Sequence, residues 1–321
     1  MIARKSGAEV QRHAGREVDL DELDEWLIRE LRTDGRASFQ DLATRLGVSR
    51  DLASQRYRTL VERDGLRVVA ALDPSYAGHH VLVHAMVEVE GPVAPVAHRI
   101  AELPDTVLVS LTSGPHPLVF ESRHGSEEQL QDMLERVRAF PGVRRVRVTT
   151  YVGILKGFFV ATKRAEVTLD ALDTALISQL QRDGRKSYKA LADTVHLSPS
   201  SVRARVKRLV DAGVIRISTI TSGKLSRTRI AVGLGITARG GGSSAIGDAL
   251  FACENVDFAV RAHGNFDYIG TLFGGTSAQM LAALEELRAL PEVGMIETWT
   301  HYDIIKESYE RASGGTIEQP E

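Results

Sequence analysis

Residues 169–180 read LDALDTALISQL, and residues 20–31 read LDELDEWLIREL, so one stretch of sequence occurs twice at a spacing of 149. The match continues at the same spacing, because Asp34-Gly35-Arg36 returns as Asp183-Gly184-Arg185. Repeats are sought first, because a missed repeat leads to a wrong fold. This one, of about 150 residues, is too long for a solenoid motif. We interpret it as a pair of domains that has been duplicated and fused.

Composition limits the class of protein. The 321 residues are 43% hydrophobic and 26% charged with a net charge of −2, which is typical of a globular protein. A single cysteine excludes a disulfide framework and a multi-cysteine zinc site, and we expect no metal and no cofactor. No apolar run reaches the roughly 18–20 residues of a membrane span, and no apolar signal segment follows Met1. We therefore expect a cytoplasmic protein with no membrane partner.

Each unit begins with apolar residues at helical spacing. In the second unit, residues 172–180 and then 191–195 mark two short helices. Ser198 is a good N-cap for a third helix, with Pro199 at its first position. Ser49 has the same place in the first unit. Three such helices predict a helix-turn-helix module.

The rest of each unit alternates strands and helices in the order β-α-β-β-α-β, the ferredoxin-like arrangement. The predicted fold class is α+β, with two winged or helix-turn-helix modules and two ferredoxin-like domains. The predicted boundaries are a disordered tail at 1–18, helix-turn-helix module 1 at 19–66, α/β domain 1 at 67–160, a linker at 161–168, module 2 at 169–216, α/β domain 2 at 217–310 and a tail at 311–321.

Several motifs of the chain resemble those of the Lrp/AsnC, or feast/famine, transcriptional regulators. They are Leu172-Asp173 with Leu176-Ile177 and Leu180, Asp183-Gly184-Arg185, Leu191-Ala192, Leu197-Ser198 with Val202, Arg205-Val206 and Leu209, Gly213-Val214-Ile215, Asp73-Pro74 with Gly78, and Leu290-Pro291 with Val293. The resemblance covers about residues 20–308. It implies DNA binding by the helical modules and binding of an amino acid or related metabolite by effector domains of the RAM type. An ordinary family member has one such unit and pairs through its effector domain. The resemblance therefore implies that α/β domains 1 and 2 are effector domains and that they form a pseudo-dimer within this one chain.

The outward residues of the third helix in each module are the candidate DNA contacts, because a helix-turn-helix places this helix in the major groove. They are Ser200, Ser201, Arg203, Ala204 and Lys207 in the second module, and Arg50, Ser54, Gln55 and Arg58 in the first. Arginine suits guanine and Gln55 suits adenine. The alternative is an ordinary solvated helix face. Arg56 and Arg205 are expected to pair with Asp24 and Asp173 rather than to contact bases.

Charge differs between the two modules. Residues 169–218 hold nine Lys/Arg and five Asp, a net charge of +4, whereas residues 20–72 hold nine Arg and ten acidic residues, a net charge of −1. Because phosphate neutralisation supplies much of DNA affinity, the second module should bind DNA more strongly. Asp51 on the third helix of the first module repels phosphate but can accept a hydrogen bond from cytosine.

A candidate effector loop lies in the second unit. The run Gly264-Asn265-Phe266-Asp267-Tyr268 resembles the Gly-x-x-Asp effector loop of the family. Gly264 permits a tight turn, Asp267 offers a carboxylate to an ammonium group, and Thr298 and Thr300 on the final strand can bind a carboxylate. The candidate effector-binding residues of this loop are Gly264, Asn265, Asp267 and Tyr268. The alternative is a turn in which Asp267 caps its own backbone.

The first unit differs at this loop. Its counterpart contains Gly114 and His116, but Pro117 stands where Asp267 does. His116 can replace the acid, although an isolated exposed histidine is usually incidental. The first loop is therefore predicted to be degenerate or of different specificity.

The leading hypothesis is a sequence-specific, DNA-binding transcriptional regulator that responds to a small molecule and is not an enzyme. Its expected partners are double-stranded DNA, an effector and further copies of the chain, as a dimer or tetramer of pseudo-dimers. One alternative is a sirohaem-decarboxylase-like enzyme on the same architecture, which needs several histidines and arginines around one cavity. The histidines show no shared pattern across the repeat, so no such cluster is expected. A further alternative is an effector module that has lost DNA binding.

Overall fold

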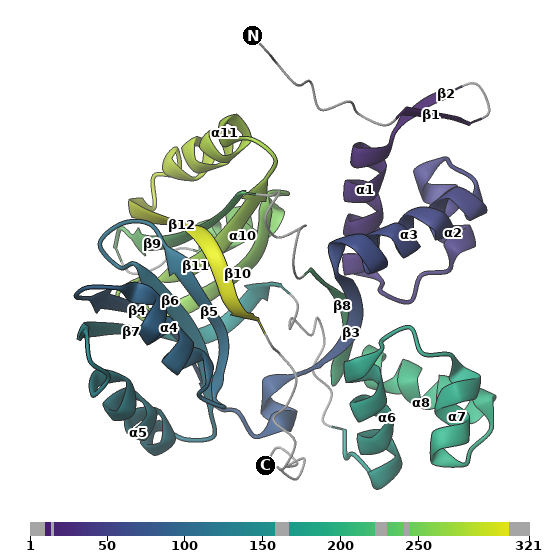
Figure 1. Cartoon of the computed structure of the whole chain (residues 1–321), viewed down its shortest axis with the longest axis horizontal. Coiled ribbons are helices and arrows are strands. Elements are labelled where there is room, and N and C mark those ends of the chain that lie inside the picture. The colour runs from purple at the N-terminus through teal and green to yellow at the C-terminus, as the bar shows by residue number, and fades with distance from the viewer. Residues whose placement is uncertain (1–9, 14–15, 158–166, 222–229, 241–243, 308–321) are drawn as a thin grey trace. The chain divides into compact units, whose positions relative to one another are not determined.

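The computed structural model describes residues 10–13, 16–157, 167–221, 230–240 and 244–307 (Figure 1). The chain folds as two compact units. The helical unit contains both helix-turn-helix modules, and the barrel unit contains both ferredoxin-like halves. The predicted linker is described only from residue 167 onwards, and the predicted tail at 311–321 lies outside the described residues. In the predicted tail at 1–18, residues 1–9 and 14–15 also lie outside them.

Each helix-turn-helix module consists of three helices. Their bounds are α1 (Leu20–Thr33), α2 (Phe39–Leu46) and α3 (Arg50–Asp64) in the first module, and α6 (Ala171–Arg182), α7 (Tyr188–Val195) and α8 (Pro199–Asp211) in the second. The predicted caps are confirmed, because Ser49 Oγ accepts from the Leu52 N–H at 3.1 Å and Ser198 Oγ accepts from the Ser201 N–H at 3.1 Å. Outside the modules, β1 (Val10–His13) pairs with β2 (Arg16–Asp19), and β3 (Leu66–Leu72) pairs with β8 (Ile215–Thr221).

The repeated Asp-Gly-Arg motif joins the two modules reciprocally. Arg36 donates to the carbonyls of Gly184 and Lys186 at 2.6 and 3.0 Å, and Arg185 donates to those of Gly35 and Ala37 at 2.7 and 2.9 Å. We call Arg36 and Arg185 the arginine clamp.

The glycines of the motif permit this approach. A Cβ on Gly35 would lie 2.8 Å from the carbonyl oxygen of Ile217 on β8, and one on Gly184 would lie 3.1 Å from the carbonyl carbon of Val68 on β3. Side chains at these two positions would therefore separate the modules.

The barrel unit contains one closed barrel in the order β10-β11-β9-β12-β5-β6-β4-β7. The first half supplies η1 (Pro74–Ala77), β4 (Val81–Val89), α4 (Val93–Ala101), β5 (Thr106–Thr112), β6 (Leu118–His124), α5 (Glu127–Arg138) and β7 (Val143–Lys156). The second half supplies β9 (Ile230–Ala238), α10 (Ser244–Ala252), β10 (Val256–Gly264), β11 (Tyr268–Gly274), α11 (Ser277–Arg288) and β12 (Val293–Glu307). Each half has the predicted β-α-β-β-α-β order.

Two equivalent seams close the barrel, because β7 pairs with β10 and β12 pairs with β5. A lysine spans each seam. Lys156 Nζ donates to the Cys253 carbonyl at 2.7 Å, and Lys306 Nζ donates to the Leu103 carbonyl at 2.8 Å. Burial lowers the pKa of both lysines. The predicted pseudo-dimer is therefore confirmed, and the two halves share one continuous sheet.

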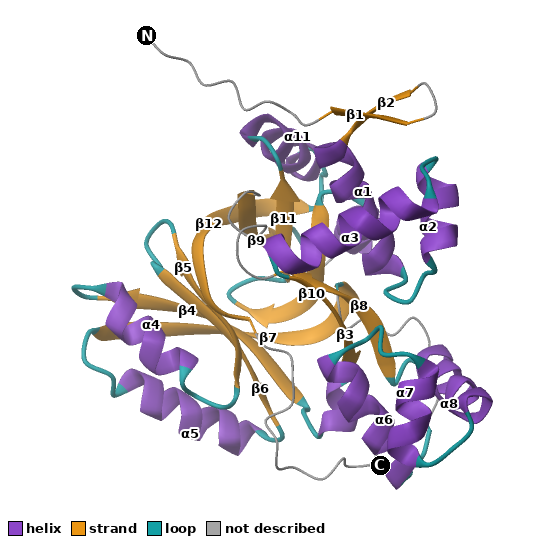
Figure 2. Ribbon diagram, turned by 45° about the vertical axis from the view of Figure 1, so that its right-hand side comes forward, coloured by secondary structure: helices purple, strands orange, loops and turns teal. Residues whose placement is uncertain are grey.

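Three apolar clusters support the barrel. The helices α4 and α5 cover the outer face of the first half, and α10 and α11 cover that of the second (Figure 2). A third cluster, which includes Val119, Phe266 and Trp299, takes residues from the strands of both halves and fills the barrel interior. Within the described residues, each helix is too short or too polar to cross a lipid bilayer.

Candidate DNA-binding and effector sites

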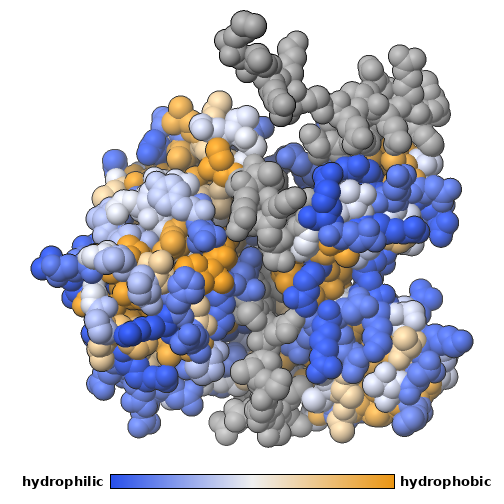
Figure 3. Space-filling model, in the orientation of Figure 1, coloured by the Kyte–Doolittle hydropathy of each residue, from blue (hydrophilic) through white to orange (hydrophobic). Residues whose placement is uncertain are grey.

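The third helix of the second module presents the predicted DNA contacts to solvent. Ser200, Ser201, Arg203, Ala204 and Lys207 are all exposed. Val202, Val206 and Leu209 are buried on the opposite face, as predicted. The helical modules show a largely hydrophilic surface on the side visible in Figure 3. The geometry required to reach a DNA groove is present, and contact with DNA stays a prediction.

The corresponding helix of the first module has the same orientation and a different charge. Arg50, Gln55 and Arg58 are exposed and Ser54 is half-buried. The exposed carboxylate of Asp51 lies 3.8 Å from the Arg50 guanidinium, so part of the cationic charge at the helix start is offset.

Ion pairs with buried aspartates hold the recognition helices α3 and α8 against the first helix of their own module. The Nε of Arg56 donates to Asp24 Oδ1 at 2.9 Å, and Nη1 of Arg205 donates to Asp173 Oδ1 at 2.9 Å. Arg208 also contacts the buried carboxylate of Asp173. The prediction that Arg56 and Arg205 pair with Asp24 and Asp173 is confirmed. The contact of Arg208 with Asp173 was not predicted.

The predicted effector loop lies at the seam between β7 and β10. Gly264 has a φ of 127°, and a Cβ at this position would lie 2.9 Å from the Val148 carbonyl oxygen, so glycine is required there. Asn265 Nδ2 donates to the Val148 carbonyl at 3.2 Å. Asp267 Oδ2 accepts from the Ala238 N–H at 2.8 Å. The Asp267 carboxylate thus caps a neighbouring strand rather than its own backbone.

The remaining predicted effector residues lie apart from this carboxylate. Thr298 and Thr300 pair with Leu234 and Val232 on β9, and their side chains lie on the face of β12 opposite to buried Trp299. The Asp267 carboxylate accepts its hydrogen bond from Ala238, at the end of β9. Tyr268 is only 4% exposed and packs in the core beneath α10. The described contacts do not join these residues into one site, and their role in binding stays a prediction.

The first-half loop has the same backbone path. Thr112 N–H donates to the Pro117 carbonyl at 2.9 Å, and Ala262 N–H donates to the Asp267 carbonyl at 2.7 Å. Gly114 has a φ of 88° with open space around its Cβ position. The expectation that His116 is exposed is wrong, because its side chain is 3% exposed. His116 stands where the second half has Phe266, and the side chain at this position of the loop points into the barrel.

Three histidines from distant parts of the sequence lie inside the barrel. His116 Nε2 is 3.6 Å from Glu88 and its Nδ1 is 3.8 Å from Glu297. His301 Nδ1 is 2.9 Å from Ser110 Oγ, and the His84 ring lies 5.3 Å from the Trp299 ring. The expectation that the histidines form no cluster is therefore wrong.

Burial keeps these imidazoles neutral. Desolvation lowers the pKa of His84 to about 3, with further lowering by His301 and His116. Desolvation lowers the pKa of His301 to about 4. It also lowers the pKa of His116, as does Arg147, against the opposing effect of Glu297 and Glu88. Within the described residues, no group of His, Cys, Asp and Glu has the arrangement of a metal site.

The barrel interior also contains a half-buried acid, Glu121. Tyr151 OH donates to Glu121 Oε1 at 2.8 Å. Desolvation raises the pKa of Glu121, against the lowering effect of this hydrogen bond. The sequence contains no local signal for the polar interior, because its members lie on different strands and meet only when the barrel closes.

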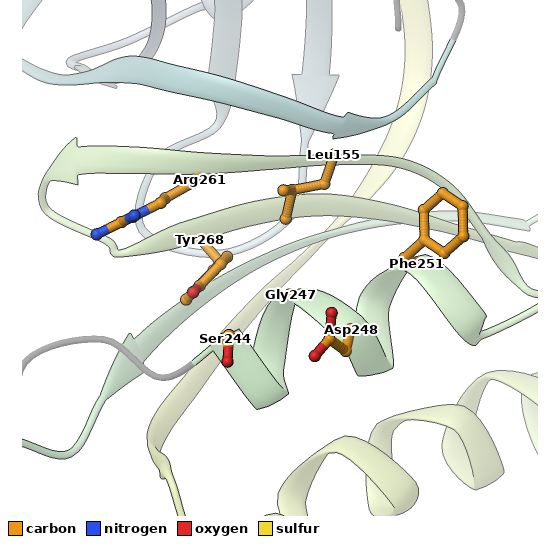
Figure 4. A pocket seen from close by; sticks show the side chains of 7 residues that line it. All are labelled: Leu155, Ser244, Gly247, Asp248, Phe251, Arg261 and Tyr268. Atoms are coloured by element: carbon orange, nitrogen blue, oxygen red, sulfur yellow. The ribbon is translucent and has the colours of Figure 1, made fainter. Parts of the chain in front are cut away.

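A pocket of about 280 Å³ lies between α10 and the strands at the β7–β10 seam (Figure 4). Its lining is Leu155, Ser244, Gly247, Asp248, Phe251, Arg261 and Tyr268. Of these, only Tyr268 was predicted as a site residue. The others were missed because each is an unremarkable residue of its own helix or strand.

Comparison with known families identifies the helical modules. The AsnC-type helix-turn-helix domain matches residues 20–61 and 169–210. The HTH-type transcriptional regulator FL11 of Pyrococcus horikoshii is 30% identical over 128 residues, which are 39% of this chain and 85% of that protein. The HTH-type transcriptional regulator LrpA of Mycobacterium tuberculosis is likewise 30% identical over 128 residues, with 39% and 85% covered.

A solved structure resembles the whole chain in fold. The siroheme decarboxylase NirDL superposes with a TM-score of 0.59 and 13% sequence identity, covering 89% of this chain and 93% of that one. At this identity the likeness concerns the fold alone. It shows that two helix-turn-helix modules and two ferredoxin-like halves occur together in another single protein.

Proposed function

This chain belongs to the Lrp/AsnC family of transcriptional regulators, and from that premise we propose that it is a one-component regulator in the cytoplasm that binds double-stranded DNA through both helical modules and a small-molecule effector through the barrel unit. The observation that carries the proposal is the exposed cationic face of α8, with Arg203 and Lys207 outward and three valine and leucine side chains buried beneath. Such a helix can enter a major groove and contact phosphates and base edges.

The arginine clamp supports a bipartite mode of binding. Because Arg36 and Arg185 hold the two modules in one unit, the recognition helices are held together before DNA is met. Two readers that share one rigid base bind two half-sites with a fixed spacing. The second module contributes most of the phosphate attraction, because its net charge is +4 against −1 for the first.

The effector is an amino acid or a related metabolite, and further copies of the chain associate as dimers or tetramers of pseudo-dimers. Effector binding changes how the barrel units of neighbouring chains associate, which alters the spacing between the clamped pairs of DNA-binding modules of those chains. The names of the relatives support the regulatory function, and the family resemblance of the effector loop supports the ligand class.

The test of DNA binding starts with selection of bound genomic fragments, followed by fluorescence anisotropy on a selected duplex at several salt concentrations. The double variant Arg203→Ala with Lys207→Ala should lower affinity about tenfold or more and reduce the salt slope by about 2, because two cationic contacts to DNA are lost. The matched variant Arg50→Ala with Arg58→Ala should have a smaller effect. Unchanged binding by the first variant at two salt concentrations would refute the assignment.

A second candidate function is decarboxylation of a tetrapyrrole, with the buried histidines His84, His116 and His301 as the observation in its favour. It is the lesser candidate, because the sequence relatives are named as regulators and α8 has retained its cationic surface. Titration with sirohaem distinguishes the two functions. A saturable absorption change that is lost in His84→Gln would favour the enzyme.

A further inference from the structure

We propose that this chain binds a directional operator, in which one half-site contains a guanine read by Arg203 and the other contains an adenine read by Gln55. The inference rests on the proposed function of a DNA-binding regulator, and it adds what each module reads. Regulators built from identical subunits bind palindromes, because the two-fold symmetry of the protein is repeated in the DNA. A palindrome would match only one of the two modules of this chain.

The framework that carries the two recognition helices is symmetric. The N-cap hydrogen bond is 3.1 Å in both modules, and one arginine–aspartate hydrogen bond of 2.9 Å holds each recognition helix to the first helix of its module. The arginine clamp is reciprocal, and both modules belong to the same compact unit. Because α3 and α8 are supported alike, a difference in what they read must come from their outward side chains.

The outward side chains are not symmetric. At the repeat spacing of 149 residues, three pairs of equivalent positions hold unlike residues: Asp51 and Ser200, Ser54 and Arg203, and Gln55 and Ala204. Ser54 is half-buried and the other five residues are exposed. Each pair differs in charge or in the hydrogen bonds that it can form. Two helices with such different groups facing the bases require half-sites of different sequence.

One outward position agrees between the modules and separates two kinds of contact. Arg58 and Lys207 are equivalent, and both are exposed and cationic. Phosphates are the same in every sequence, so a residue that only holds the backbone of the duplex can stay alike in both modules. Arg58 and Lys207 therefore contact phosphates, whereas the unlike pairs face the bases.

The second module has the side chain that suits guanine. The guanidinium of Arg203 can donate two parallel hydrogen bonds, to O6 and N7 of guanine in the major groove. Val202 and Val206 are buried on the opposite face of α8, which keeps Arg203 directed outward. The neighbouring Ala204 has no polar group, so the second module cannot make the amide contact that is available to the first.

The first module has the side chain that suits adenine. The amide of Gln55 can donate to N7 of adenine and accept from its N6 amino group. Ser54 stands where the second module has Arg203, and its hydroxyl lies 3.5 Å from the Arg58 guanidinium. A short serine cannot form the two-pronged contact with guanine that arginine forms. The guanine contact therefore belongs to the second module.

The test begins with selection of bound sites from a random duplex library by the full chain. The selected motif should contain two unlike half-sites, one with a guanine and one with an adenine. Anisotropy then compares three duplexes of about 25 base pairs, which accommodate two half-sites one helical turn apart. They are the selected site and two palindromes, each of which repeats one half-site at the same spacing. Each palindrome should bind about tenfold more weakly or worse, because one module faces mismatched bases.

Single variants connect each half-site to its module. Arg203→Ala should remove the preference for guanine and leave that for adenine, and Gln55→Ala should do the reverse. The matched control Lys207→Ala should weaken binding to all three duplexes by a similar factor, because a phosphate contact is independent of sequence. Because these positions are exposed, circular dichroism should show native folding in the three variants.

A double variant exchanges the readers. Ser54→Arg with Gln55→Ala gives the first module the two residues that the second module has at these positions. It should improve binding to the palindrome of guanine half-sites and weaken binding to the selected site, each by about tenfold. An unchanged order of affinities in a folded double variant would show that positions 54 and 55 do not face the bases.

Two further results would overturn the proposal: selection of a palindrome within the span of one chain, or equal affinity for the selected site and either palindrome. Both would leave the proposed function intact, because the chain would still bind DNA. A guanine preference that persists in Arg203→Ala would overturn the assignment of that residue. Failure to bind any duplex would instead remove the proposed function together with this inference.

Discussion

The two halves of this chain have one backbone plan and differ in chemistry at equivalent places. The second half has the cationic recognition helix and the open pocket, whereas the first has a nearly neutral module. Inside the barrel the relation is reversed. The first half supplies His84 and His116, where the second supplies Gly233 and Phe266. The polar side chains are therefore concentrated in different places in the two halves: on the outer surface in the second half and inside the barrel in the first.

The largest expected effect tests the polar interior that comes chiefly from the first half. Folded-state pKa values of about 3 for His84 and about 4 for His301 lie below the value of about 6.5 in an unfolded chain. The unfolded state therefore binds more protons on acidification, and the free energy of unfolding falls as the pH drops below about 6.5. The two histidines together should remove at most about 5 kcal/mol between about pH 6.5 and 4.5.

Urea denaturation followed by circular dichroism at several pH values measures this loss. In His84→Gln the pH dependence should become clearly smaller, because one of the buried histidines that take up a proton on unfolding is gone. A pH dependence identical to that of the native chain would show that His84 is not held neutral by the fold.

The next effect compares the two arginines of the clamp. Both donate to two carbonyls of the opposite module. Arg185 also lies over the rings of Phe39 and Tyr57, at 4.9 and 5.3 Å, whereas among the described residues Arg36 lies over one ring, that of Tyr188, at 4.4 Å. Arg185→Ala should lower the free energy of unfolding of the helical unit by about 3 kcal/mol and Arg36→Ala by about 2 kcal/mol. Denaturant titration with a helical signal gives both numbers, and a larger loss for Arg36→Ala would contradict this ranking.

A smaller effect concerns the glycines of β9. A Cβ on Gly233 would lie 2.0 Å from Trp299 Nε1, so Gly233→Ala must displace the indole and should destabilise the chain by about 1–3 kcal/mol. Gly153 on β7 is the matched control, because no atom of the described residues lies within 4 Å of its Cβ position. The melting temperature of Gly233→Ala should therefore be clearly lower than that of Gly153→Ala. Equal melting temperatures would mean that the Trp299 indole can move aside without a loss of stability.

The smallest effect is expected where the halves agree. Ser49→Ala and Ser198→Ala each remove one N-cap hydrogen bond, of 3.1 Å in both modules, and should each lower stability by about 1 kcal/mol. The loss should be slightly larger for Ser198→Ala, because Ser198 Oγ also lies 2.9 and 2.8 Å from the hydroxyls of Ser200 and Ser201. A larger loss for Ser49→Ala would contradict this order. Chemical denaturation of both variants under one condition is sufficient.

The helical modules were predictable from sequence because their signals are local. Spacing along one helix is enough to bury Val202, Val206 and Leu209 and to expose Arg203 and Lys207, as the structure has them. The caps follow from one serine and the residues just after it. The order of strands and helices in each half was predictable for the same reason.

The interior and the pocket were not predictable, because they depend on which strands meet. Alternating apolar residues indicate a strand without naming its partner, and the seams join β7 to β10 and β12 to β5 across more than a hundred residues. His116 therefore resembles an exposed loop residue until the barrel closes around it. The Asp-Gly-Arg repeat was visible in the sequence. Its role as a link between the two modules was not, because each arginine donates to backbone carbonyls of the other module.

The closure of the barrel by two seams within a single polypeptide has a thermodynamic consequence. Association between separate subunits weakens on dilution by mass action, whereas a contact made inside one chain does not. The two ferredoxin-like halves therefore remain paired one to one even at vanishing concentration, whether or not further copies of the chain associate. Each half can diverge in sequence, because its partner half is covalently attached to it.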